Sequence, residues 1–473
     1  MATINSAFNL ISSALEADQS ALNIVANNVA NANTTGYTRE VPNWQENKPA
    51  QINGVSYGTG VTETGPTSAR DRILEERLAQ QQQTAAASGA RMAALDTLQA
   101  LFTPDSGASG STAGDIGSDI TSFFNSFSSL EANPADSALR QQVLSTASTL
   151  AGDVSNAAAS LISQGSALDQ EAAGVTSQVN SLTAAIANLN QQIRSTSPDK
   201  DAGTLEDQRQ QDLSKLSLLI GINQITTENN SLSITTTSGE LLVSQGSSFQ
   251  LTTSKVSGDT HFFVGTADLT SQLADGGGEL GGYLTARDQD IPKVISSLDQ
   301  LAYSISTQVN AQNNAGSDLN GVAGTVANPL NIFKPAAAVA GSAASMYVIM
   351  TDPSQIAAAG LGQGTGDNSN TSALASLAAQ SIIGGKTPSG FYANFVATLG
   401  SAISQVQIEN TAQSASVTQL QTQRDALSSV NLNDEAASMQ QIERSYQAAS
   451  QVFAILNTIM SSALNLGIGT AVS

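Results

Sequence analysis

The residues that could carry out chemistry are few and isolated. The one histidine, His261, lies in the predicted strand His-Phe-Phe-Val-Gly, where a solvent-facing or hydrogen-bonded side chain is far more common than a general base without partners. The glycine run between Asp275 and Glu279 lacks the spacing and the following Lys-Ser/Thr of a phosphate-binding loop. No Gly-x-Ser-x-Gly elbow and no carboxylate cluster with calcium-loop spacing occurs in the sequence. We therefore expect no enzyme, no cofactor and no metal site.

Composition narrows the class of protein further. The 473 residues include no cysteine, which removes disulfides and thiol chemistry and suits a chain that leaves the cell unfolded, although cysteine is also rare in polar bacterial proteins. The formal net charge of -21, with 18 scattered Lys and Arg, argues against nucleic acid and anionic membrane surfaces. No apolar run approaches the roughly 18 residues of a membrane span, and no signal peptide is visible. An extracellular chain would need another export route.

The strongest pattern is a narrow apolar stripe at each end of the chain. Both stripes advance by alternating steps of three and four residues, which places them on one side of an α-helix. The N-terminal stripe is Ile4, Phe8, Ile11, Leu15, Leu22, Val25 and Val29, with Asp18 in line, and the C-terminal stripe is Met439, Ile442, Tyr446, Ala449, Phe453, Leu456, Met460 and Ala463. Since so narrow a seam cannot bury itself, we expect the two end helices to pair. Asp18 either fixes the register or marks where the seam frays.

Low charge around these stripes indicates further partners. Residues 1–38 contain two charged side chains and residues 431–473 contain four. Heptad seams alone more often indicate internal packing. A helix pair exposed to water, however, needs charged outer faces to stay soluble, whereas these faces carry Asn, Ser, Gln and Ala. We therefore expect the paired ends to pack against other molecules.

The remaining patterns predict an elongated, mainly α protein with a small β part. Helical periodicity covers about 3–33, 70–101, 115–130, 134–194, 203–220, 290–313, 391–429 and 434–466, the last helix capped by Asn433 or Asp434. Residues 37–69 are predicted to be extended, 106–114 a Gly/Ser-rich connector, 276–282 a flexible hinge and 346–350 a strand. Residues 222–264 alternate β-branched stretches with turn residues, which predicts antiparallel hairpins.

Chain order gives a nested layout of three domains. Residues 1–40 and 431–473 are predicted to form a terminal coiled-coil assembly domain. Residues 41–221 and 286–430 form a helical bundle domain with an irregular insertion at 314–390, and residues 222–285 form a small β-rich region. Both termini then lie at one end of the molecule.

Several segments resemble a known family. Residues 26–39, Ala-Asn-Asn-Val-Ala-Asn-Ala-Asn-Thr-Thr-Gly-Tyr-Thr-Arg, resemble the N-terminal signature of flagellar rod, hook and hook-associated proteins, and residues 438–467 resemble their C-terminal element. Residues 281–292 and 431–435, with the long helical middle, resemble the first hook-associated protein family, the subunits of the hook-filament junction. Residues 314–390 match it poorly. The signature residues expected at the assembly interface are Asn27, Asn28, Asn31, Asn33, Gly36 and Tyr37.

The resemblance implies an extracellular structural subunit of the bacterial flagellum that self-assembles into a ring between hook and filament. It also implies contacts with the hook protein and the second junction protein, unfolded type III export without a cleaved signal peptide, and a dedicated chaperone at the C-terminal helix. Two other interpretations stay open: another axial protein, such as the second junction protein or a hook subunit, and, more remotely, a secreted coiled-coil effector or adhesin.

Overall fold

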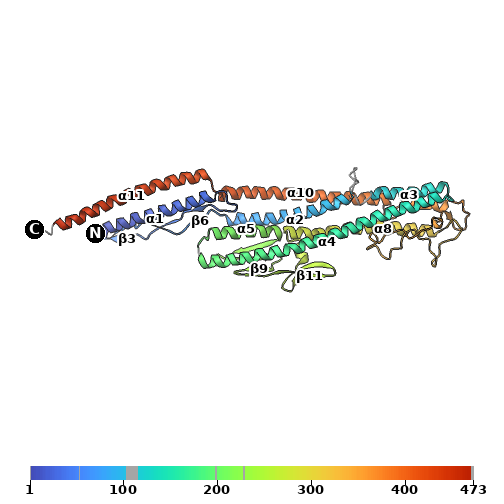
Figure 1. Ribbon diagram of the computed structural model, residues 1–473, viewed down its shortest axis with the longest axis horizontal. Coiled ribbons are helices and arrows are strands. Elements are labelled where there is room, and N and C mark those ends of the chain that lie inside the picture. The colour runs from blue at the N-terminus through green and yellow to red at the C-terminus, as the bar shows by residue number, and fades with distance from the viewer. Residues whose placement is uncertain (1, 53, 103–114, 198–199, 227–229, 470–473) are drawn as a thin grey trace.

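The structure, a computed structural model, describes residues 2–52, 54–102, 115–197, 200–226 and 230–469. It is elongated and mainly helical, with both termini at one end and the small sheets beside the middle of the bundle (Figure 1). The predicted fold class and the paired end helices are therefore confirmed. The predicted connector at 106–114 lies outside the described residues.

The predicted helices begin and end within a few residues of their observed positions. They are α1 (Ala2–Asn31), α2 (Arg72–Phe102), α3 (Ile116–Ala132), α4 (Ser137–Thr196), α5 (Thr204–Leu219), α8 (Ile291–Asn314), α10 (Pro388–Ser428) and α11 (Leu432–Gly469). The short helices α6 (Thr270–Ala274), α7 (Gly278–Thr285) and α9 (Ser369–Ser376) were not predicted at these positions. With 60 residues, α4 is about 90 Å long and runs the length of the bundle. Asp136 caps it by accepting hydrogen bonds from the amides of Ala138 and Leu139.

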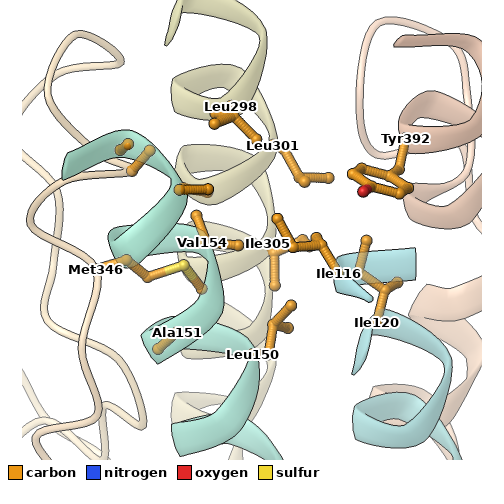
Figure 2. Packing of buried hydrophobic residues seen from close by; sticks show 14 of the residues in the cluster. Ile116, Ile120, Leu150, Ala151, Val154, Leu298, Leu301, Ile305, Met346 and Tyr392 are labelled. Atoms are coloured by element: carbon orange, nitrogen blue, oxygen red, sulfur yellow. The ribbon is translucent and has the colours of Figure 1, made fainter. Parts of the chain in front are cut away.

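The main core fills the space between helices far apart in sequence. In Figure 2, Ile116 and Ile120 of α3 meet Leu150 and Val154 of α4 and Ile305 of α8. Each of these side chains is at most 1% exposed, which removes most of the apolar surface of three helices from water.

The insertion at 314–390 is irregular, as predicted, and it is firmly attached to α8. Irregular backbone has no helix or strand partners for its N–H and C=O groups, so these groups need other hydrogen-bond partners. The buried side-chain amides of Asn310 and Asn313 on α8 supply them. Asn310 donates to the Phe333 carbonyl at 2.8 Å and accepts from the Ile332 amide at 2.9 Å. Asn313 donates to the Leu330 carbonyl at 2.6 Å. The short elements here are β14 (Gly316–Ser317), β15 (Ala359–Gly360), η2 (Pro353–Gln355) and η3 (Leu377–Ala379).

The strand predicted at 346–350 is wrong. The described segment forms one isolated bridge, between Phe333 and Val348, and Met346 instead points into the bundle core (Figure 2). Met346 and Met350 are buried, whereas Tyr347 and Ile349 between them are exposed, so the apolar run is partly buried without forming a β-strand.

The predicted hairpins are confirmed as two small antiparallel sheets with strand orders β10-β9-β8-β7 and β11-β12-β13. Their strands are β7 (Ile222–Thr226), β8 (Leu232–Thr236), β9 (Leu241–Ser244), β10 (Ser247–Ser248), β11 (Leu251–Val256), β12 (Asp259–Val264) and β13 (Ala267–Asp268). They pack on α4 and α6, so this region is carried by the bundle.

The hinge predicted at 276–282 is wrong, because most of this segment is helix α7. A Cβ on Gly282 would lie 2.3 Å from the Ala87 carbonyl oxygen of α2, and one on Gly281 would lie 2.9 Å from the Leu273 carbonyl oxygen. These glycines therefore serve close packing and not mobility. Helix α7 continues through a π-helical turn, η1 (Ala286–Asp290), into α8. Arg287 of that turn donates to Asp169 of α4 at 2.6 Å.

An extended segment follows α1 and turns back along it. Its strands are β1 (Glu40–Val41), β2 (Trp44–Glu46), β3 (Ala50–Ile52), β4 (Val55–Tyr57), β5 (Val61–Glu63) and β6 (Thr67–Ser68). They pair as β1 with β6, β2 with β5 and β3 with β4. We call residues 40–68 the strap. Because the strap contacts α1 through β1 and β5, it belongs spatially with the terminal helices, although residue 41 was predicted to begin the bundle domain.

Candidate assembly site at the paired termini

Helices α1 and α11 lie side by side and form the end of the molecule that carries both termini (Figure 1). Phe8 and Phe453 meet edge to face, with ring centroids 5.2 Å apart and planes at 87°. The two predicted stripes therefore face each other at this level.

The N-terminal stripe is only partly covered by this pairing. Val25 is 2% exposed, whereas Val29 is 40% exposed. Phe8, Ile11, Leu15 and Leu22 are half-buried, and nothing is described for the side chain of Ile4. Residues not included in the stripe, Ala17, Ala21 and Ile24, are buried as well, so the covered face of α1 is wider than the predicted seam.

The C-terminal stripe is still more open. Tyr446 and Phe453 are 38% and 37% exposed, and Met439, Ile442, Leu456 and Met460 are half-buried. Among the described side chains of α11, only Glu435 is buried. Since an apolar helix face needs cover in water, α11 has unsatisfied packing surface.

Asp18 lies on the seam between the helices. Its Oδ2 atom is buried and has no hydrogen-bond partner among the described residues. The pairing continues past it to Phe8, so Asp18 does not mark where the seam frays.

One asparagine joins α1, the strap and α11. The Nδ2 atom of Asn28 donates to the Glu40 carbonyl at 2.8 Å and to Glu435 Oε2 at 3.1 Å. Its Oδ1 accepts from the Glu40 amide at 2.9 Å and from the Tyr37 hydroxyl at 2.8 Å. Asn28 thus pairs with both backbone groups of Glu40, as a strand neighbour would, and is 1% exposed.

The carboxylate of Glu435 completes this joint. Arg39 donates to its Oε1 at 2.6 Å, and the Arg39 amide donates to the Ser428 carbonyl at the end of α10 at 2.8 Å. A buried carboxylate requires such charged and polar partners. The break between α10 and α11 is therefore held by the segment that follows α1.

Asn431 caps α11, because its Oδ1 accepts a hydrogen bond from the Asn433 amide at 3.0 Å. The predicted caps, Asn433 and Asp434, are therefore wrong by two or three residues.

The other signature residues shape the end of α1. Gly36 has φ of +78°, the left-handed conformation that glycine adopts readily after the end of a helix. Asn31 donates to Asn27 Oδ1 at 2.9 Å, and Asn27 and Asn33 are exposed. Burial, followed by the charge of Glu40, raises the pKa of Tyr37, which keeps its hydroxyl a donor to Asn28. Asn28 and Tyr37 therefore act within the chain, while Asn27 and Asn33 remain open to other molecules.

A second polar cluster fastens this end to the bundle. The amide of Thr38 donates to Asp207 Oδ2 of α5 at 2.9 Å. Arg70 pairs with the same carboxylate and donates to Glu206 Oε2 at 3.0 Å. All three charged side chains are at most 7% exposed. Such desolvated ion pairs are sensitive to the loss of either partner.

Comparisons with known proteins match different parts of the chain, and nearly its full length, to flagellar proteins. Residues 106–326 match the family model described as the flagellar hook-associated protein FlgK helical domain, and residues 8–38 match the one described as flagella basal body rod protein. Flagellar hook-associated protein 1 of Salmonella typhimurium (strain LT2) is 25% identical over 563 aligned positions, covering 98% of this chain and 100% of the relative. That of Bacillus subtilis (strain 168) is 27% identical over 508 positions, covering 96% and 97%. Along nearly its whole length the chain is similar to members of the flagellar hook-associated protein 1 family, which are structural proteins of the flagellum.

A solved structure supports the fold of this chain. The flagellar hook junction protein FlgK from Burkholderia pseudomallei superposes with a TM-score of 0.65 at 18% identity, covering 75% of this chain and 100% of that chain. At this identity the likeness concerns the fold alone.

His261, which was considered for chemistry, makes a contact within the small sheets. His261 Nδ1 lies 2.7 Å from Asp268 Oδ2 on adjacent strands. Hydrogen bonds from Thr270, then that of His261, hold the pKa of Asp268 at about 2. In the described parts of the chain, no helix has the length and apolar character to cross a membrane.

Sequence reasoning missed the charged half of the joint. Arg39 and Glu435 are 396 residues apart, and the bundle contact of Asp207 with Thr38 spans 169. The signal available in the sequence was the position of Glu435, which is one of only four charged residues in 431–473. A charged side chain beside an apolar helix seam is rarely buried unless it has a charged or polar partner.

Proposed function

We propose that this chain is the subunit that joins the hook of the bacterial flagellum to its filament, and that copies of it self-assemble into a ring. The proposal is supported mainly by the exposed apolar side chains of α1 and α11, in a terminal unit that buried polar contacts and ion pairs fasten to the bundle. Exposed apolar side chains on a charge-poor helix pair favour association with neighbours. Similarity to flagellar hook-associated proteins supplies the flagellar setting.

The assembly interface is proposed to include the two predicted stripes, the exposed signature residues Asn27 and Asn33, and the half-buried Asn31. Asn28, Gly36 and Tyr37 contribute indirectly, by holding the pair and the strap in position. The ring is proposed to contact the hook protein on one side and the second junction protein on the other.

We also infer that the chain reaches the flagellum by unfolded type III export, without a cleaved signal peptide, and assembles outside the cell. The apolar surface of α11 supports a dedicated chaperone on this helix, because an amphipathic segment needs cover before it reaches its neighbours. Removing residues 432–473 is expected to abolish chaperone binding while the bundle still folds, as measured by co-purification and circular dichroism.

The contacts favour a modified division into domains. We propose a terminal assembly domain of residues 1–68 and 431–473, because the strap lies on α1. The helical bundle domain then comprises 69–221 and 278–430 with its insertion at 314–390, since α7 packs on α2. The β-rich region is 222–277.

The junction role is tested by deleting the gene. The expected result is cells that still form hooks but have no filaments, with filament protein released into the medium. A plasmid copy should restore filaments, and a copy lacking residues 432–473 should not. Normal filaments on cells without the chain would contradict the proposal.

A further inference from the structure

A second apolar stripe on α11 points away from α1. It consists of Val452, Ile455 and Ile459, which are 43%, 57% and 48% exposed. Each residue directly precedes a member of the first stripe, so the second is turned by about 100° around the helix. The steps of three and four residues make it a separate seam that α1 does not cover.

The strap carries another open apolar face at the same end. In the hairpin of β3 and β4, Ala50 pairs with Tyr57, and side chains alternate between the two faces. Val55 and Tyr57 therefore share a face and are each 52% exposed. Ser56, between them, lies on the opposite face.

The two open faces lie at similar heights along the molecule. Phe453, next to Val452, meets Phe8 near the start of α1. A Cβ on Gly60, which follows the hairpin, would lie 3.2 Å from Leu10 and 2.5 Å from the hydroxyl of Ser13. The hairpin and the second stripe are thus both level with the first turns of α1.

They also lie on different flanks of α1. Ser13 and Ser20, which meet the strap, are turned by about 120 to 140° around α1 from Phe8, which meets α11. Figure 1 shows α1 between α11 and the strap. The remaining face of α1 carries the exposed Glu16, Gln19 and Asn23, which cannot cover an apolar seam.

We propose that the apolar hairpin face of one copy, Val55 and Tyr57, packs on the second α11 stripe of the next copy, Val452, Ile455 and Ile459. We assign a second copy of the chain as the partner because the two exposed apolar faces at this end differ from each other, lie at the same height along the molecule and are on different sides of α1. Unlike faces on one molecule pack head to tail, and such contacts close into a ring when the rotation permits. This inference rests on the proposed self-assembly and identifies its lateral contact.

Cross-linking tests the contact, because the chain has no cysteine of its own. The double variant Val55→Cys/Ile455→Cys is expressed in cells whose own copy is deleted, and isolated flagella are oxidised with copper phenanthroline. The expected result is a ladder of disulfide-linked dimers, trimers and larger multimers. The matched control, Ser56→Cys/Ile455→Cys, places the thiol on the other hairpin face and should give at least about tenfold less product.

Single-cysteine variants separate the possible geometries. They should remain monomeric, and dimers from either one would show that like faces meet, which overturns the proposal. Equal ladders from the test and control pairs would also overturn it. If the oxidised test pair gives no ladder in flagella with normal filaments, the lateral contact is refuted while the junction role stands. Filaments on cells without the chain would refute the junction role instead.

A second measurement does not depend on thiols. Tyr57→Asp and Ile455→Asp each place a charge in the proposed contact and are expected to reduce incorporation into flagella at least about tenfold. Ser56→Asp, on the opposite face, should leave it unchanged. Normal incorporation of both test variants would overturn the inference.

Discussion

Replacing Asn28 by Ala should open the terminal joint without unfolding the bundle. The substitution removes four hydrogen bonds, two to the backbone of Glu40, one to Tyr37 and one to Glu435. Each is worth about 0.5–1.5 kcal/mol net, and the bond to a carboxylate about 1.5–3 kcal/mol. Because water can enter the vacated space, we expect a cost of about 3 kcal/mol, or opening roughly a hundredfold more frequent.

Asn27→Ala is the matched control. It makes the same chemical change one position earlier in the same helix, so the gain in helix propensity, about 0.6 kcal/mol, cancels in the comparison. Asn27 is exposed, and its side chain donates weakly to the Tyr37 hydroxyl at 3.4 Å and accepts from Asn31 at 2.9 Å. Water can replace both of these hydrogen bonds at the surface. The control should therefore cost less than about 0.5 kcal/mol.

Hydrogen exchange followed by mass spectrometry measures the effect. In Asn28→Ala, amides of α1, the strap and the first turns of α11 should exchange faster, while those of α3, α4 and α8 keep their wild-type protection. Equal exchange in the two variants would refute the role assigned to Asn28. Faster exchange throughout the bundle would show that the joint is not a local unit.

Two further predictions concern the bundle. Burial, then a hydrogen bond with Asp153, raises the pKa of Asp119 to about 7, so its contribution to stability is present below about pH 4 and is lost as pH rises through 7. Since Asp119 is partly exposed, we expect a loss of about 1–2 kcal/mol between pH 5 and 8 in thermal melts, and Asp119→Asn should abolish that dependence. Gly282→Ala should destabilise the bundle by about 2–3 kcal/mol, because its Cβ would lie 2.3 Å from the Ala87 carbonyl oxygen, whereas Gly152→Ala, with no atom within 4 Å, should stabilise α4 by up to about 1 kcal/mol. Equal melting temperatures for the two glycine variants would contradict this account of α7.

The sequence by itself determined the local elements. Apolar periodicity placed α4 and α10 within a few residues, since a repeat of three and four reports which side of a helix is covered. The left-handed conformation of Gly36 is likewise a local property, because glycine has no Cβ to oppose a positive φ. The pairing of the ends followed from two stripes too narrow to bury themselves.

Only the tertiary structure decided which distant groups meet. Gly281 and Gly282 were mistaken for a hinge, because their role depends on the carbonyl groups that face them, those of Leu273 and Ala87. The Asn28–Glu435 contact joins residues separated by 407 positions, and no periodicity within either helix encodes it. The position of the strap along α1 and the exposure of the second stripe on α11 depend on non-local packing in the same way. A sequence pattern records that a face is covered, whereas the identity of what covers it is fixed by non-local packing and, for the open faces of this chain, by its neighbours.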